Sequence, residues 1–410
     1  MPTSRRILMI GTGGTIASEP TPSGLAPLRS DTFFRRIRHH PQLSDPLHTV
    51  PPTPSVQVGP NTRYPQLITP ELDEQGSTVR YEILDLDRHM DSSEMTPAEW
   101  NTIARLVEEN WERYDGFVIL SGTDTLAYTA SILTFLFTNA GKPIVVTGAQ
   151  VPLSQPRSDG WTNILDSLFV AGILPYAGVG VVFHHQVFHG ARATKTSPNL
   201  FAAFQSPCVP PLINLNVKIM WRDRPRRNTS SSPSSIIIIV TPMPPRAQAP
   251  EFGPTTHEPS LPPRTPSLPP RLVPLVTSPT VLSCSIHPGI TGTLLSAQID
   301  AVPTCRAVIL SAYGSGNLPI NPASGVLDAL KGAVEKEILV VVISQCGIPN
   351  VYPLYTQGRT LLSIGVLPGY DLTHEAAFAK LLWLVSRKDL SFAQRQALFQ
   401  SPVAGEMTLH

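Results

Sequence analysis

The chain has 410 residues, of which 41% are hydrophobic and 15% charged, a balance typical of a globular protein with room for two domains. The 31 lysines and arginines offset 30 aspartates and glutamates, and the resulting net charge of +1 argues against a nucleic-acid-binding surface. No apolar run reaches the roughly 18 residues that span a bilayer, and the four cysteines lack zinc-site or disulfide-framework spacing. We therefore expect a cytoplasmic protein without metal, nucleic-acid or membrane partners.

Short apolar runs alternate with helical patterns through the first half of the chain. Strands are expected at 7–10, 117–120, 143–148 and 179–184, and helices at 96–114, 125–137 and 159–173. Thr96, Pro97 and Glu99 form a capping-box sequence at the start of the first of these helices. The alternation predicts a mostly parallel sheet covered by helices.

The composition changes after residue 222. Residues 223–280 are rich in proline and serine, which predicts a disordered linker or insertion, although the IIIIV run at 236–240 could be a docked strand. The α/β pattern then resumes, with strands at 307–310 and 337–344 and helices at 325–336, 372–386 and 391–399. We predict an α/β fold with a larger N-terminal domain at 1–222, containing the catalytic residues and a mostly parallel sheet, and a smaller C-terminal α/β domain at 281–410.

A glycine-rich turn, GTGGTIAS at 11–18, directly follows the first strand. Open α/β sheets bind ligands at the carboxyl ends of their strands, so this is a candidate binding segment. Gly11 and Gly13 fit the start of a dinucleotide fingerprint, but Ile16 occupies the third glycine position, which disfavours nucleotide binding. Two interpretations remain open: an ordinary turn, or a turn that approaches a small substrate and presents the hydroxyl of Thr15.

Two further polar segments follow strands. Thr123 and Asp124 lie on a turn that opens a helix, where an aspartate usually caps the helix. Lys195 lies in the polar loop GARATKTSPN, where a lysine is usually solvated but could support activation of a threonine hydroxyl. Neither segment is decisive by itself.

The order of these motifs along the chain is more informative than any one of them. The N-terminal half contains, in order, GTGGTIAS, MDSSEMT, GTDTLAYTAS, VTGAQVPL with RSDG, and RATKTS. The C-terminal part adds HPGI, AYGSGN, DLTHEAAFAKL and GEMT. Together they resemble the bacterial-type L-asparaginase family, in particular its type I cytosolic branch. The resemblance covers about residues 5–222 and 281–410.

The resemblance implies hydrolysis of L-asparagine to L-aspartate and ammonia, without a cofactor, by a homodimer or homotetramer. It assigns Thr15 as the nucleophile that forms an acyl-enzyme, Thr123 and Lys195 to proton movement, and Asp124 to the substrate α-ammonium group. The implied substrate-binding positions are Gly14, Ser92, Ser93, Ser121, Gly122 and Asn317, the last reaching the site across a subunit interface.

Three departures from the family pattern leave alternatives open. Ser121 stands where many relatives have histidine, and Leu25 is the nearest match to a lid tyrosine that orients or deprotonates the threonine. The third departure is the Pro-rich insertion. Glutamine or another amide could therefore be preferred, or a weakly active domain could act as a scaffold through polyproline segments.

The cluster FHHQVFHG contains His184, His185 and His189 and raises the question of a metal site. Adjacent side chains on a strand point to opposite faces of the sheet, so we do not expect these histidines to converge on one ion.

Overall fold

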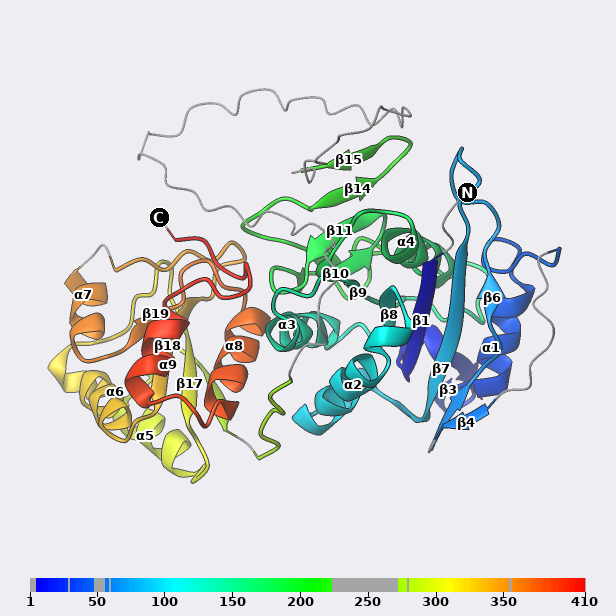
Figure 1. The fold of residues 1–410 in the computed structure, drawn as a ribbon. Helices are drawn as coiled ribbons and strands as arrows, with labels where there is room; N and C mark the ends of the chain where they lie inside the picture. The colour runs from blue at the N-terminus through cyan, green and yellow to red at the C-terminus, as the bar shows by residue number, and fades with distance from the viewer. Residues whose placement is uncertain are drawn as a thin grey trace.

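The computed structural model describes residues 5–28, 30–47, 56–58, 60–222, 272–278, 280–353 and 356–409. Residues 223–271, which contain the IIIIV run and the Pro-rich segments, lie outside this description. The chain forms a larger N-terminal unit and a smaller C-terminal unit that lie side by side (Figure 1). None of the helices that the structure describes has the length and apolar character needed to cross a bilayer.

The N-terminal unit is built on a large mixed sheet. Its central strands run parallel in the order β7 (Val79–Met90), β1 (Arg5–Gly13), β8 (Gly116–Leu120), β9 (Pro143–Thr147) and β10 (Gly178–Phe183). Antiparallel strands extend both edges: β11 (Gln186–His189), β14 (Ile213–Leu215) and β15 (Ile219–Trp221) beyond β10, and β4 (Val56–Val58), β5 (Asn61–Arg63) and β6 (Leu67–Ile68) beside β7. When these five parallel strands are numbered along the chain, their spatial order across the sheet is 2-1-3-4-5, as in a doubly wound fold. Ligands bind to such sheets where the strand order reverses.

The central strands are apolar on both faces because helices cover both. In β8, Phe117 and Ile119 join the core under α2 (Pro97–Glu109) and α3 (Leu126–Leu136). The alternate residues Val118 and Leu120 join the core under α1 (Ser30–His39) and α4 (Gly160–Gly172). This arrangement explains why the strands are continuous apolar runs in the sequence.

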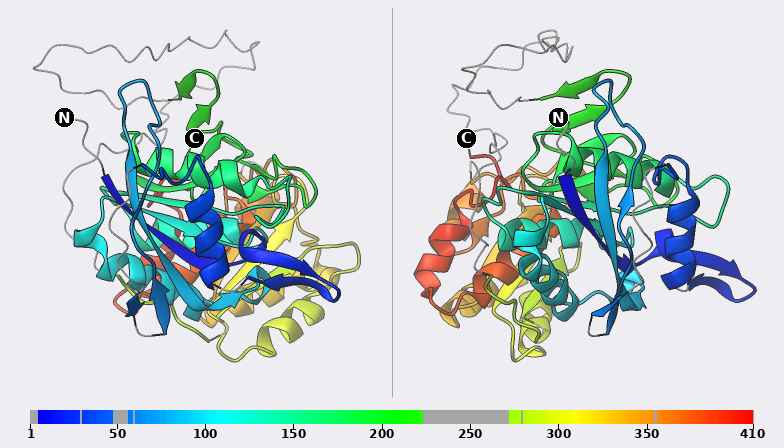
Figure 2. Two further views of the ribbon diagram at one scale, coloured as in Figure 1. Left: turned by 90° about the vertical axis from the view of Figure 1, so that its right-hand side faces the viewer. Right: turned by 45° about the vertical axis from the view of Figure 1, so that its right-hand side comes forward.

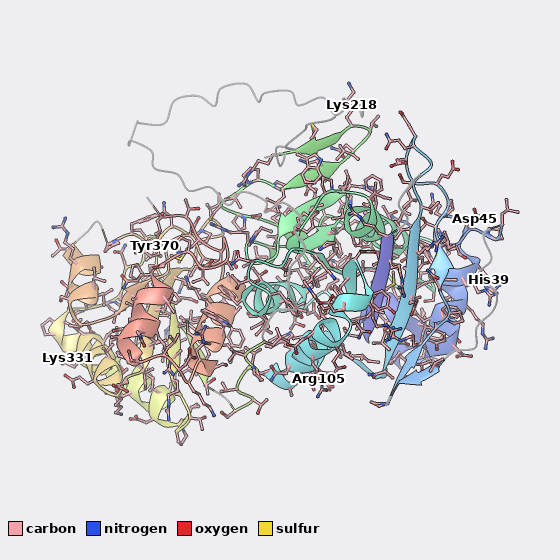
Figure 3. The ribbon with its side chains drawn as sticks, in the orientation of Figure 1. His39, Asp45, Arg105, Lys218, Lys331 and Tyr370 are labelled. Carbon is pink, nitrogen blue, oxygen red and sulfur yellow. The ribbon has the colours of Figure 1, made fainter. Side chains whose placement is uncertain are left out.

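The C-terminal unit contains a smaller parallel sheet in the order β16 (Val281–Ser285), β17 (Ala307–Ala312), β18 (Leu339–Ser344) and β19 (Leu367–Pro368). Its helices are α5 (Gly292–Asp300), α6 (Val326–Glu335), α7 (Thr356–Ser363), α8 (His374–Ser386) and α9 (Phe392–Phe399). Helix α8 lies between the two units, and its residues share one continuous core with α3 and with β17 and β18 (Figure 1). Charged side chains such as Arg105 on α2 and Lys331 on α6 project outward (Figure 3).

The main elements expected from the sequence are confirmed, with small shifts at their ends. The capping box is present, since Thr96 caps α2, Pro97 is its first residue, and the Glu99 carboxylate accepts the Thr96 N–H. The α/β class with a larger and a smaller parallel-sheet unit is likewise confirmed.

The placement of two histidines was wrong. His184 and His185 have positive φ angles of 47° and 60° and form the two-residue turn between β10 and β11, so His184 is not in the strand. The strand argument against a metal site therefore does not apply to this pair. His185 instead contacts Asp166, with Nδ1 3.0 Å from Oδ2. Within the described ranges, no group of three or more His, Cys, Asp or Glu side chains is arranged to hold a metal ion.

The end of the predicted linker also differs from expectation. Leu275 is buried, its N–H donates to Asn101 Oδ1 at 2.8 Å, and its carbonyl accepts from Asn101 Nδ2 at 2.9 Å. The N–H of Val276 donates to Ser386 Oγ at the end of α8. Residues 272–278 are therefore an ordered strap between α2 and α8, and the prediction of disorder across 223–280 was wrong for this part.

His189, at the end of β11, makes stability sensitive to acid. Burial, followed by the positive charge of Arg192, lowers its pKa to about 4, below the ordinary value of about 6.5. Between these values the unfolded chain binds a proton that the folded chain does not, so stability is lost as the pH falls from about 6.5 to 4.

We expect His189→Gln to reduce the loss of unfolding free energy between pH 7 and pH 5 by about 2 kcal/mol. Urea denaturation at the two pH values measures this difference. The matched control is His287→Gln, because His287 is exposed. An unchanged pH dependence in His189→Gln would contradict the prediction.

Candidate active site

Two glycine turns meet at the carboxyl ends of adjacent strands. Strand β1 leads through Gly14 into a short 3-10 helix (Thr15–Ala17), and β8 leads through Ser121 and Gly122 into α3. These ends flank the point where the strand order reverses, which is where doubly wound sheets bind ligands. A Cβ atom on Gly14 would lie only 2.3 Å from Cα of Gly122, and Gly14 has a φ of 81°. Only glycine permits this contact.

Ser92 packs against the second of these turns. It begins the short helix Ser92–Glu94 after β7, the other neighbour of β1 in the sheet. A Cβ atom on Gly122 would lie 2.6 Å from Ser92 Oγ, so the serine is packed directly against that glycine. Thr125 Oγ1 donates to the Ser92 carbonyl at 2.8 Å, which ties this turn to the start of α3.

Lys195 joins the group from a distant part of the sequence. Its Nζ donates to Thr123 Oγ1 at 2.8 Å and to Asp124 Oδ1 at 2.7 Å. Thr123 is buried, whereas 65% of the Asp124 side chain is exposed, so the carboxylate stays accessible to a second cation. The structure thus places together three of the four residues predicted to be catalytic.

Thr15 is the fourth of these residues. It follows Gly14, which contacts Gly122, the residue that precedes Thr123. It is half-buried, and its hydroxyl has no hydrogen-bond partner among the described residues. The Gly14 carbonyl accepts the Ala17 N–H at 3.1 Å and the Ser18 hydroxyl at 2.9 Å, which fixes the turn that carries Thr15.

A β-hairpin follows the short helix Thr15–Ala17, at the position of the lid that the family resemblance implies. It consists of β2 (Ser18–Thr21) and β3 (Gly24–Pro27) and projects from the body of the molecule (Figure 2). Leu25, the nearest match to the family tyrosine, lies on this hairpin and is 54% exposed. An aliphatic side chain at this position cannot exchange a proton with the threonine.

The remaining predicted substrate-binding residues differ in their placement. Ser93 is exposed, and both its N–H and its hydroxyl donate to Asp91 Oδ1 at 2.9 Å. Ser121 is buried, and its hydroxyl donates to the Gly122 carbonyl at 3.3 Å. Asp91 and Thr125, which hold the serine turn in place, were not singled out from the sequence, although an aspartate before two serines is a recognisable turn signal.

Asn317 lies apart from this group. It pairs with Tyr313 in the turn after β17 and lines an open cavity of about 670 Å³ with Ser315 and Gln357. Within the part of the chain that the structure describes, no hydrogen bond joins it to the Gly14–Gly122 turns. Its role across a subunit interface stays a prediction.

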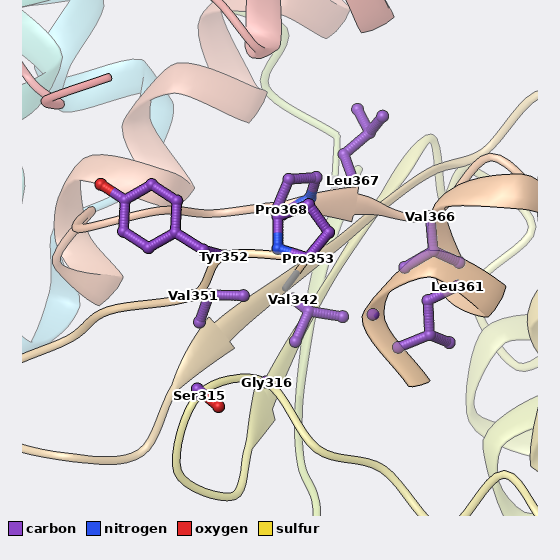
Figure 4. A pocket seen from close by; sticks show the side chains of 11 residues that line it. Ser315, Gly316, Val342, Val351, Tyr352, Pro353, Leu361, Val366, Leu367 and Pro368 are labelled. Atoms are coloured by element: carbon purple, nitrogen blue, oxygen red, sulfur yellow. The ribbon is translucent and has the colours of Figure 1, made fainter. Parts of the chain in front are cut away.

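A second pocket lies in the C-terminal unit and is too small for a substrate. It is lined by apolar side chains, among them Val342, Val351 and Leu361, and encloses about 20 Å³ (Figure 4). This space holds about one water molecule. The Gly14–Gly122 turns, beside which Thr123, Asp124 and Lys195 meet, are therefore a better candidate for the active site than this pocket.

Two family models match the chain, and the first of them covers the Gly14–Gly122 turns. The model described as "Asparaginase, N-terminal" matches residues 6–227, and that described as "Glutaminase/Asparaginase C-terminal domain" matches residues 280–399. The chain belongs to the asparaginase family. The boundary at 280 agrees with the start of β16 at Val281.

Individual proteins show the same similarity. L-asparaginase 1 of Escherichia coli K12 is 36% identical over 325 residues, which cover 78% of this chain and 82% of that protein. The mouse 60 kDa lysophospholipase is 31% identical over 407 residues, but the chain spans only 63% of its length. The crystal structure of L-asparaginase I from Vibrio cholerae superposes with a TM-score of 0.73 at 32% identity, covering 99% of this chain and all of that one.

Proposed function

We propose that the protein hydrolyses the side-chain amide of L-asparagine and releases L-aspartate and ammonia. The observation that carries the proposal is the contact of Lys195 with both Thr123 and Asp124, beside the touching Gly14 and Gly122 turns. This group combines a hydroxyl, a cation and an accessible carboxylate at the ligand-binding end of the sheet. Membership of a family that includes proteins named L-asparaginase supports the same assignment.

In the proposed reaction the hydroxyl of Thr15 attacks the amide carbon and forms an acyl-enzyme. Thr123 accepts a hydrogen bond from Lys195, so its own hydroxyl proton is free to point toward the reacting groups. We assign to this pair the movement of the proton from Thr15 to the departing ammonia. Water then attacks the ester and releases aspartate, which restores the Thr15 hydroxyl.

Recognition of a zwitterionic amino acid needs an anion for its ammonium group and donors for its carboxylate. Asp124 provides the exposed carboxylate oxygen, and Ser92 provides hydroxyl and backbone donors. Ser93 can donate to the substrate only by releasing the bonds from its N–H and hydroxyl to Asp91. Because Leu25 cannot act as a proton acceptor, proton transfer at Thr15 depends on Thr123 and Lys195 in this proposal. We also propose that the enzyme is cytoplasmic, in line with its four free cysteines, and that it is a homo-oligomer, as the family resemblance implies.

A panel of amides with ammonia detection tests the proposal. We expect kcat/KM for L-asparagine to exceed that for L-glutamine by about 10- to 200-fold, because one additional methylene in a fitted pocket costs about 1–3 kcal/mol. D-asparagine is the stereochemical control, and N-acylated asparagine tests whether the free ammonium group is required. A higher kcat/KM for glutamine or for the acylated compound than for L-asparagine would contradict the substrate assignment. If none of these amides released ammonia, the proposed function would be refuted.

A further inference from the structure

We propose that Glu375 is a positioning residue that holds Lys195 in place through Thr194. This inference rests on the proposed function, because it concerns the lysine that we assign to proton movement. Glu375 lies in the other structural unit, on the first turn of α8, and does not itself belong to the Gly14–Gly122 group.

The contact follows from the geometry of a very short strand. Thr194 and Lys195 form β12, which pairs with β13 (Phe204–Gln205). Consecutive side chains of a strand point to opposite faces. Lys195 accordingly contacts Thr123 and Asp124 on one side, while Thr194 Oγ1 donates to Glu375 Oε1 at 2.8 Å on the other.

The lysine strand needs such an anchor. A strand of two residues is held in its orientation only weakly by pairing with its neighbour. The lysine side chain adds a flexible chain of four carbons between the backbone and the charge. Glu375, in contrast, is only 9% exposed and lies on the first turn of a helix that is capped by Thr373, whose Oγ1 accepts the Ala376 N–H at 3.1 Å. A hydrogen bond from Thr194 to this rigid helix start therefore fixes the backbone from which Lys195 extends.

His374, the neighbour of Glu375 on α8, contacts the helix that follows Thr123 and Asp124. His374 Nδ1 lies 2.9 Å from the hydroxyl of Tyr128, which is on α3 one turn beyond Asp124. His374 Nε2 lies 2.8 Å from Ser283 Oγ on β16. The start of α8 thus contacts both β12, which carries Lys195, and α3, which follows Thr123 and Asp124.

Hydrogen-bond acceptance, more than negative charge, is what this role requires. Burial raises the pKa of Glu375, and the hydrogen bonds from its own N–H, Thr194 and Thr373 oppose that rise. A glutamine side chain keeps an oxygen that can accept from Thr194. The conservative variant should therefore preserve the position of Lys195.

Steady-state kinetics of four single variants and one double variant on the best amide of the panel tests the inference. We expect Glu375→Ala and Thr194→Val each to lower kcat about tenfold with KM changed less than about threefold, because the proton-transfer geometry is lost. Glu375→Gln and Thr194→Ser should stay within about threefold of the wild type in kcat. The double variant Glu375→Ala/Thr194→Val should be no slower than either single variant, since both remove one interaction.

Ser283→Ala is the matched control, because it alters a contact at the same helix start without touching β12. A tenfold loss in this control, additive losses in the double variant, or wild-type kcat in Glu375→Ala would overturn the inference. If the wild type hydrolyses no amide, the proposed function fails, and the inference is still decided by NMR of the protein with ¹³C-methylated lysines. The Lys195 signal, assigned by its absence in Lys195→Arg, should shift in Glu375→Ala but not in Glu375→Gln; no shift in either would overturn it.

Discussion

Replacing Thr15 by alanine should lower kcat/KM for the preferred amide by a factor on the order of 10⁴ or more. The proposed acyl-enzyme cannot form without this hydroxyl, and the neighbouring Thr123 accepts a hydrogen bond from Lys195 and lies on the other turn. The fold should be unaffected, because Thr15 is half-buried and its hydroxyl has no hydrogen-bond partner among the described residues. Ammonia release and the urea midpoint, measured on the same preparation, separate lost chemistry from lost folding.

Thr15→Ser is the matched control for this experiment. Serine keeps the hydroxyl but loses the methyl group that restricts the threonine rotamer, so we expect a reduced but measurable rate. Hydroxylamine provides a second test: a common acyl-enzyme should give the same ratio of hydroxamate to acid from different leaving groups. Wild-type turnover in Thr15→Ala would exclude this residue as the nucleophile, and a ratio that depends on the leaving group would exclude the intermediate.

Replacing Lys380 by methionine should lower the free energy of unfolding by about 3–5 kcal/mol. Lys380 and Glu406 are both fully buried, with Nζ 2.5 Å from Oε1, and Nζ also donates to the carbonyls of Phe399 and Ser401. Burial alone would raise the pKa of Glu406, but the pairing with Lys380 holds it below its ordinary value. Without the lysine, a carboxylate would be left buried beside unpaired carbonyl groups.

The pair Lys336–Asp300 provides the matched control. Its Nζ–Oδ1 distance is 2.8 Å, but both side chains are about 60% exposed, so Lys336→Met should cost less than about 1 kcal/mol. The double variant Lys380→Met/Glu406→Gln should recover part of the loss, because it removes the uncompensated charge. Urea denaturation measures all three, and equal losses for Lys380→Met and Lys336→Met would contradict the explanation.

The sequence was sufficient for those parts of the site that depend on local patterns. GTGGT and SGTD each follow an apolar strand, and the carboxyl ends of adjacent parallel strands meet at one edge of a sheet. Their close approach depends on Gly14 and Gly122, which are visible in the sequence as residues without a Cβ atom. The capping box of α2 was equally readable from Thr96 and Glu99.

The contact of Lys195 could not be derived in the same way. It joins residues 71 and 72 positions apart, and its strand of two residues has no periodicity. Only the family resemblance connected them in advance. Composition was misleading at 272–278, where Leu275 is buried and Leu272 and Val276 pack against the same core. The His184–His185 turn was missed because its positive φ angles occur without glycine.

Helix α8 has a consequence for the thermodynamics of the whole chain. Its residues belong to a single core together with α3 on one side and β17 and β18 on the other. If either unit lost its structure, the apolar surface of this helix would be exposed to water on that side, at a cost proportional to the area uncovered. The two units are therefore distinct in topology but not independent in stability. Unfolding of the N-terminal unit is coupled to unfolding of the C-terminal unit.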